Sequence, residues 1–120
     1  MRKLELYEEF QKRSKLANQF KLKYGNKLDS IFIFEDPASV ELNQIIINKN
    51  NRNEGIGSEI LGDVVNYADR ENKIVTLTPA DDHGSSLSRL KKFYKRFGFV
   101  FNKGKNKDFR FRDSMIRYPS

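Results

Sequence analysis

The segment NRNEGIGSEIL (Asn51–Leu61) decides how this chain is interpreted. Two of the seven glycines, Gly55 and Gly57, stand one residue apart shortly after Arg52, where an amphipathic helix begins. The first N–H groups of a helix have no intrahelical partner, and that end of the helix is positive. Glycines there remove Cβ atoms and let a large anion approach the backbone. The segment therefore predicts a phosphate or pyrophosphate cradle, although paired glycines before a helix also occur as a simple tight turn.

Two familiar phosphate-binding motifs do not fit this segment. A Walker loop needs Gly-Lys-Ser or Gly-Lys-Thr after four spacer residues, and the chain contains neither triplet. A dinucleotide-binding fingerprint needs a third glycine where Ile60 stands, and it should lie near a first strand. An anion cradle at this place would therefore be of another kind.

The residue pattern around the segment predicts an α/β protein. Apolar residues at helical spacing predict helices over residues 3–24, from Ser58 to about Glu71, and over 87–97 after an N-cap at Ser85 or Ser86, with Gly98 at the end of the last helix. Short β-branched and aromatic runs predict strands over residues 30–36, 40–48, 73–79, 99–102 and 108–118, the last two forming a hairpin around Gly104. The order is α-β-β-α-β-α-β-β, with a crossover helix between two strands of the sheet.

Length and composition limit the class of protein. A chain of 120 residues suits one domain over residues 1–120. It has no cysteine and a single histidine, His83, so neither disulfides nor a zinc site is supported and no metal is expected. No apolar run approaches the ~20 residues of a membrane span, and the charged N-terminus lacks a signal-peptide core. We therefore expect a cytoplasmic protein with no membrane partner.

Charge is distributed unevenly along the chain. The net charge of +7 is the sum of +5 over residues 1–28, −7 over residues 29–88 and +9 over residues 89–120. The basic C-terminal third is typical of proteins that meet a polyanion, such as nucleic acid or a phosphorylated cofactor. A solvated lysine-rich surface explains the same pattern without a partner.

The sequence RNEGIG (residues 52–57) resembles the Gln/Arg-x-x-Gly-x-Gly/Ala signature of the GNAT N-acetyltransferases. It follows an apolar strand and precedes a helix, as in that superfamily. LKKFYKRFGFVFN (residues 90–102) is similar to the second signature of the family, and Met115 in the last strand also fits. The resemblance covers about two-thirds of the chain. It implies a mixed, mostly antiparallel sheet with helices on both faces and a splayed pair of parallel central strands.

The resemblance also implies a cofactor, acetyl-CoA, and the residues that hold it. Its pyrophosphate would rest on the N–H groups of the glycine loop beside Arg52, and its pantetheine would pair with the open edge of the preceding strand. Many members have a pantetheine-binding asparagine where Leu87 stands here, so a neighbouring serine is expected to replace it. The residues assigned in this way are Ile45, Ile46, Ile47, Arg52, Asn53, Glu54, Gly55, Ile56, Gly57, Ser58 and Ser86.

Acetyl transfer from a thioester to an amine needs a neutral amine, a donor for the developing oxyanion and a proton for the thiolate. A backbone N–H near Ile46 or Ile47 is a candidate oxyanion donor. Tyr94 stands at the family position of the general acid, although it also fits the apolar stripe of its helix as a core residue. Glu41 stands where histone-acetylating members carry their base, and strand alternation puts it on the face of Ile45; it also suits a solvated strand end.

Three polar residues after the third predicted strand, Asp81, Asp82 and His83, form a loop cluster near the expected substrate entrance. They are further candidates for the base, although such clusters also occur as simple loops.

The leading hypothesis is an acetyl-CoA-dependent N-acetyltransferase that transfers the acetyl group directly to a primary amine. Two alternatives remain open at this point. The basic and aromatic residues of the C-terminal third suit a nucleic-acid-binding module, and a GNAT-like protein can bind acyl-CoA without turnover. The sequence leaves open which amine is acetylated and whether the protein is a monomer or a homodimer.

Overall fold

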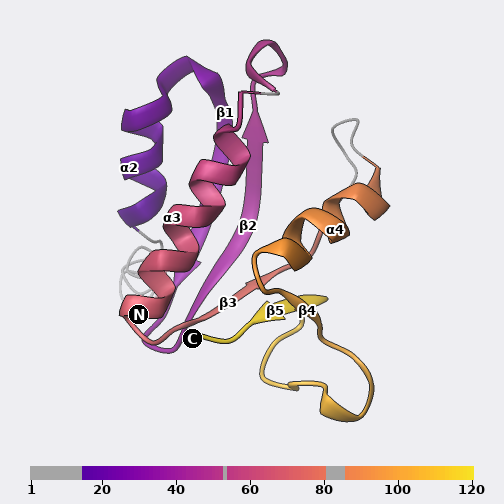
Figure 1. Cartoon of the computed structure of the whole chain (residues 1–120). Coiled ribbons are helices and arrows are strands. Elements are labelled where there is room, and N and C mark those ends of the chain that lie inside the picture. Colours follow the sequence, from indigo (N-terminus) through magenta and orange to yellow (C-terminus); the bar gives the residue numbers. More distant parts are fainter. Residues whose placement is uncertain (1–14, 53, 81–85) are drawn as a thin grey trace, which may run out of the picture.

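The computed structural model describes residues 15–52, 54–80 and 86–120. Along the chain, the elements are α2 (Lys15–Tyr24), η1 (Gly25–Lys27), β1 (Leu28–Glu35), β2 (Ser39–Ile47), η2 (Lys49–Asn51), α3 (Ile56–Arg70), β3 (Ile74–Leu77), α4 (Leu87–Arg96), β4 (Val100–Phe101), η3 (Gly104–Asn106) and β5 (Met115–Arg117). The predicted order of helices and strands is confirmed for the described residues, and Figure 1 shows their arrangement. Each end of the first three strands differs from its predicted position by one or two residues.

The five described strands form one mixed sheet in the order β1-β2-β3-β5-β4. Within it, β2 and β3 run parallel, whereas β1 with β2, β3 with β5 and β4 with β5 are antiparallel. Helix α3 makes the crossover between the two parallel strands. The mixed, mostly antiparallel sheet with a central parallel pair is therefore confirmed.

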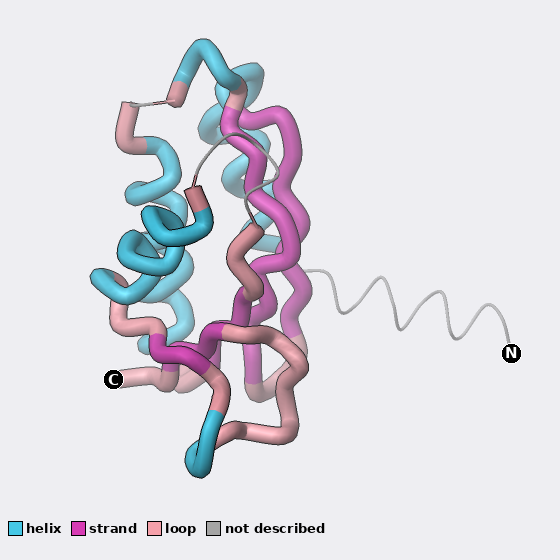
Figure 2. Tube along the Cα trace, turned by 90° about the vertical axis from the view of Figure 1, so that its right-hand side faces the viewer, coloured by secondary structure: helices cyan, strands magenta, loops and turns pink. Residues whose placement is uncertain are grey.

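One apolar core joins the helices to the sheet. The buried stripe of α3, which includes Ile60 and Val64, meets the buried side chains of β1 and β2. Phe20 of α2 belongs to the same cluster, and Tyr94 of α4 packs against it. Figure 2 shows most of the helical segments on one side of the strands. Residues 1–14, which include the first part of the helix predicted over residues 3–24, lie outside the described residues.

The parallel pair β2/β3 opens after four residues. Pairing runs from Ser39 with Ile74 to Leu42 with Leu77 and stops there, while β2 continues to Ile47. Pro79 has no N–H for a ladder. Thr78 is drawn toward β5: its hydroxyl donates to Asp113 (2.9 Å) and accepts from the Ser114 N–H (3.1 Å). Figure 1 shows β2 and β3 diverging from this point.

A β-bulge in β2 changes which side chains face the core. Phe32 pairs with Gln44 and the next residue, Ile33, pairs with Leu42, so Asn43 is the extra residue. The extra residue inverts the alternation of β2 side chains between the two faces of the sheet. Ile45 therefore packs on the core, whereas Glu41 lines a pocket on the opposite face. The expectation that Glu41 and Ile45 share a face is therefore wrong.

The predicted strand over residues 108–118 is also wrong, apart from β5. The last two strands pair antiparallel, as the predicted hairpin requires, but a long connection between Phe101 and Met115 replaces the expected turn around Gly104. Asn102, which is 8% exposed, organises it: its amide donates to the carbonyls of Asp108, Phe111 and Asp113 at 3.1–3.3 Å, and its oxygen accepts from the Asp108 N–H at 2.7 Å. These bonds replace a strand ladder.

None of the described helices is long and apolar enough to span a membrane.

The C-terminal strand is attached to α3 by a mostly buried ion pair. Arg117 contacts Asp69 at 2.7 and 3.0 Å and donates to the Phe97 carbonyl at 2.8 Å. These hydrogen bonds from Arg117 lower the pKa of Asp69. A carboxyl group whose pKa is lower in the folded chain stabilises the fold above its unfolded pKa, about 3.9, and loses that contribution as the pH falls through its folded pKa.

Asp69→Asn is therefore expected to reduce the acid dependence of stability. Denaturant unfolding at a series of pH values should give a wild-type free energy of unfolding that declines below about pH 4, and a smaller decline for the variant. Asp63→Asn is the matched control on the same helix, because the ion pair that Asp63 forms, with Lys23 at 3.7 Å, lies at the surface. Equal acid slopes for wild type and Asp69→Asn would contradict the assignment.

Candidate functional site

A pocket of about 210 Å³ lies where β2 and β3 diverge. Its walls come from the end of β2, the first turns of α3, the chain after β3 and the inner side of α4. The lining residues are Ile45, Ile46, Ile47, Arg52, Gly57, Leu61, Ala80, Leu90, Phe93 and Tyr94. The structure thus brings the predicted strand, the glycine loop and the tyrosine to one cavity. Leu61, Leu90 and Phe93 were not expected there, because their spacing marks them only as core residues.

The N-terminus of α3 presents bare backbone at the mouth of this pocket. Gly55 is the N-cap with φ 79° and ψ 10°, a left-handed conformation that favours glycine, and it has no side chain to cap the helix. The Glu59 N–H already bonds to the Gly55 carbonyl at 3.0 Å, so the preceding N–H groups are the ones without intrahelical partners. Gly55 and Ser58 are exposed and Gly57 is half-buried, whereas the Ile56 side chain belongs to the core.

The charges beside this helix end are of both signs. Arg52 is exposed, lines the pocket and donates from Nε to the Ile47 carbonyl at 3.4 Å. The carboxylate of Glu54 accepts from the Asn51 amide at 2.9 Å and pairs with Lys27 at 3.4 Å. The hydrogen bond from Asn51 is the main reason that the pKa of Glu54 lies below its ordinary value. Asn53 lies outside the described residues.

The strand edge on the other wall is open toward the pocket. Residues 45–47 pair with β1 on one side, through Ile31, Ser30 and Leu28. Among the described strands, none pairs with them on the other side, because β3 has already ended at Leu77. The side chains of Ile45 and Ile47 pack against the core, so this wall offers backbone groups rather than polar side chains.

Tyr94 combines a packed ring with a hydroxyl that no described residue engages. The ring makes edge contacts with Phe93 (5.4 Å between centroids) and Phe99 (5.9 Å). Burial raises the pKa of the Tyr94 phenol, so the group stays protonated at neutral pH. A protonated phenol at the pocket wall has the chemistry of a proton donor. Tyr94 therefore belongs both to the packing of the core and to the wall of the pocket.

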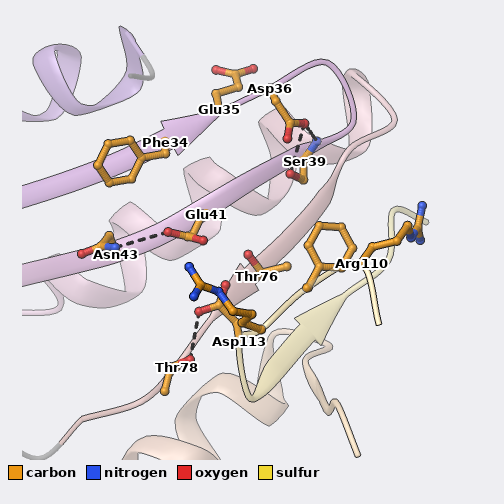
Figure 3. Close-up of a pocket in the computed structure, with 12 residues that line it drawn as sticks. Phe34, Glu35, Asp36, Ser39, Glu41, Asn43, Thr76, Thr78, Arg110 and Asp113 are labelled. Atoms are coloured by element: carbon orange, nitrogen blue, oxygen red, sulfur yellow. Dashed lines mark hydrogen bonds between the residues drawn. The ribbon is translucent and has the colours of Figure 1, made fainter. Parts of the chain in front are cut away.

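A second pocket, of about 630 Å³, lies against the opposite face of the same two strands. Figure 3 shows Glu41 and Asn43 from β2 and Thr76 from β3 on its walls, with Asp113 approaching from the chain before β5. Glu41 accepts a hydrogen bond from the Asn43 amide at 3.2 Å. Sequence reasoning missed Asp113, because the pattern of residues 108–114 predicts a strand.

Glu41 and Tyr94 do not meet in one cavity. Glu41 lines the second pocket and Tyr94 the first, on opposite faces of the sheet. The two cavities nevertheless approach one another where the sheet opens. Along β2, Asn43 lines the second pocket and Ile45 lines the first; after β3, Thr78 lines the second pocket and Ala80 lines the first. Two residues of strand span about 7 Å. The remaining base candidates, Asp81, Asp82 and His83, lie outside the described residues.

Ser86 is occupied as a helix cap. Its Oγ accepts from the Arg89 N–H at 3.1 Å, as an N-cap serine does, and Ser86 is not among the residues that line the first pocket. Its expected contact with pantetheine therefore has no support in its position.

Ser86→Ala should lower the free energy of unfolding by about 1 kcal/mol and leave ligand affinity unchanged. Ser88→Ala is the matched control, because Ser88 is an exposed serine within the same helix. Chemical denaturation of the two variants measures the difference. A loss of coenzyme affinity in Ser86→Ala alone would mean that the hydroxyl binds the ligand.

The basic and aromatic residues of the C-terminal third are divided between core and surface. Phe99 is buried, and Phe101 packs against the core while Lys91, Lys95 and Lys103 lie 4.5–5.6 Å from the centre of its ring. Phe109 is 84% exposed. None of these three lysines lines the first pocket, and Arg52 is the basic residue among its described lining residues.

Comparison with solved structures identifies the fold. The chain superposes on the anti-CRISPR protein AcrVA5 with a TM-score of 0.55 and 20% sequence identity, covering 72% of this chain and 85% of that one. It superposes on a putative GNAT-family acetyltransferase from Bacteroides thetaiotaomicron with a TM-score of 0.50 and 17% identity, covering 75% of this chain and 54% of that one. No protein-family model and no curated protein matches the sequence. The structural similarity establishes a GNAT-like fold for this chain, and at such low sequence identity it establishes the fold alone.

Proposed function

We propose that this chain, which has a GNAT-like fold, is an acetyl-CoA-dependent N-acetyltransferase that acetylates a primary amine by direct attack on the thioester. The fold suggests an acyltransferase at a coarse level. One observation carries the finer proposal: the bare N-terminus of α3, the open edge of β2 and the Tyr94 phenol line a single pocket. A nucleic-acid-binding module would have no need of that combination.

The residues present fit the coenzyme. A pyrophosphate is a large anion, and the exposed N–H groups at the start of α3 are the kind of donors that bind one. A Cβ at Gly57 would point toward Ile47, 3.4 Å from its Cδ1, so glycine keeps this side of the pocket clear. Arg52 adds a positive charge, and the backbone of residues 45–47 offers a strand edge for the pantetheine. The bound coenzyme supplies the activated acetyl group as a thioester.

Tyr94 and the strand edge provide the groups that assist transfer. A backbone N–H near Ile46 or Ile47 stabilises negative charge on the acetyl oxygen. Tyr94 Oη holds the proton that the departing sulfur takes up, and the raised pKa of this phenol keeps that proton in place before transfer. Overall, the N–C bond of the amide forms, the C–S bond breaks, and one proton passes in net terms from the amine to the sulfur.

The second pocket is the proposed entrance for the amine. Because the two cavities lie on opposite faces and approach at the sheet opening, an amine in the second pocket would reach the thioester without displacing the coenzyme. Glu41 is the proposed group that receives the amine proton; it is half-buried and engages only Asn43 among the described residues. A cationic amine is attracted there by carboxylates of the acidic central segment.

The proposal is tested by adding acetyl-CoA to the purified chain and measuring the melting temperature and thiol release with a panel of primary amines. We expect the melting temperature to rise with coenzyme concentration by simple linkage, and thiol to appear only when an amine is present. A rise without thiol release would identify an acyl-CoA-binding protein. Absence of both effects, with a salt-dependent affinity for oligonucleotides, would identify the nucleic-acid-binding module instead.

A further inference from the structure

Some of the ionic side chains that line the second pocket already have a charged or backbone partner among the described residues, and others do not. Glu35 is engaged by Tyr67 and by the Lys73 ammonium, and Arg110 forms a double hydrogen bond with Asp108 at 2.9 and 2.7 Å. Asp36 accepts from the Ala38 and Ser39 N–H groups within its turn. These groups have structural partners and are not needed to recognise a ligand.

Three charged groups of the pocket remain available. Glu41 and Asp113 accept neutral hydrogen bonds, from Asn43 and Thr78 respectively, and neither forms an ion pair with a described residue. Arg112 is exposed, lines the pocket, and makes no hydrogen bond or ion pair within the described chain. The pocket therefore offers two carboxylates and one guanidinium to an incoming molecule.

The position of Arg112 is set by the fold around it. The carbonyls of Phe111 and Asp113, its two neighbours, both accept from the buried amide of Asn102. The Asp113 side chain is also bound by Thr78 at 2.9 Å. Because the backbone on both sides of Arg112 is attached, the base of this side chain is fixed at the wall of the pocket, and binding has to order only the side chain itself.

We propose that the amine acceptor carries a carboxylate, and that Arg112 binds this carboxylate while Glu41 and Asp113 attract the ammonium. This inference rests on the proposed function and adds the class of its acceptor. A guanidinium matches a carboxylate with two parallel hydrogen bonds. A dianionic phosphate would meet two nearby carboxylates, so a singly charged group suits the pocket better. A diamine would place its second cation against Arg112.

Three unbranched amines of equal carbon number test the proposal: δ-aminovalerate, pentylamine and cadaverine. Their dissociation constants are measured by NMR titration against wild type and Arg112→Gln, with acetyl-CoA turnover recorded separately. We expect wild type to bind δ-aminovalerate about tenfold more tightly than pentylamine, which corresponds to about 1.4 kcal/mol, and cadaverine most weakly. Arg112→Gln should lose the preference for the carboxylate and bind cadaverine better than wild type does.

Arg110→Gln is the matched control, because Arg110 lines the same pocket but is already bound to Asp108. It should keep the wild-type ranking of the three amines. Equal affinity of wild type for δ-aminovalerate and pentylamine would overturn the inference, and so would a carboxylate preference that survives in Arg112→Gln. In either case, turnover of pentylamine would still support acetyl transfer. A carboxylate preference that depends on Arg112, without thiol release from any amine, would overturn the proposed function alone.

Discussion

Gly57→Asp should weaken acetyl-CoA binding by about 100-fold or more while leaving the fold intact. A Cβ at this position would point toward Ile47, and a carboxylate there would occupy the region where the pyrophosphate is proposed to bind. Like charges placed together across a binding surface cost several kcal/mol, and 1.4 kcal/mol is a factor of ten in affinity. Gly57 is the second residue of α3, where an aspartate is favourable to the helix dipole. Calorimetric titration with acetyl-CoA measures the effect.

Gly62→Asp is the matched control for this variant. It makes the same change of size and charge on the same helix, but Gly62 does not line the coenzyme pocket, and a Cβ added there would meet no neighbouring atom within 4 Å. We expect its affinity for acetyl-CoA to equal that of wild type, within the small effect of one added negative charge. Equal losses in the two variants would mean that overall charge, and not the start of α3, controls binding.

Tyr94→Phe should lower kcat by about 100-fold or more without weakening coenzyme binding. General acid catalysis by a positioned group contributes about 10²–10⁴ in rate. The ring packs against Phe93 and Phe99 and a phenylalanine keeps those contacts, while the hydroxyl that is lost has no hydrogen-bond partner among the described residues. Thiol-release kinetics at saturating acetyl-CoA, together with calorimetry, separate the effect on kcat from any effect on binding.

Tyr118→Phe provides the comparison for Tyr94→Phe. It removes an exposed hydroxyl that donates to Asp108 at 3.0 Å, away from the coenzyme pocket. It should leave kcat unchanged. A normal kcat in Tyr94→Phe would assign the tyrosine to the core alone, and the proton would then have to reach the sulfur by another route.

The parts of the site that local chemistry determines could be predicted from the sequence. The left-handed N-cap at Gly55 favours a residue without a Cβ, and the segment from Arg52 to Ser58 predicts the start of α3 for that reason. Ser86 was predictable as the cap of α4, and Gly98, with φ 94°, as the residue that ends it. Each of these signals depends on residues within one helical turn.

The parts that depend on long-range contacts could not be predicted. The bulge at Asn43 has no sequence marker, yet it separates the face of Glu41 from that of Ile45. The alternating FRFR run (residues 109–112) is typical of a strand, but the Asn102 side chain takes the hydrogen bonds that a ladder would need. Arg112 therefore lies at the second pocket because of a connection whose shape is determined by one buried amide.

The central claim is that the N-terminus of α3 and the edge of β2 bind acetyl-CoA together. A titration of the ¹⁵N-labelled chain with acetyl-CoA, followed by amide NMR, tests it residue by residue. We predict that the largest shifts occur at Gly55, Gly57 and Ser58 and at residues 45–47, with little change at Lys103 and Lys105. Shifts confined to the basic C-terminal residues, or no shifts at saturating coenzyme, would contradict the account.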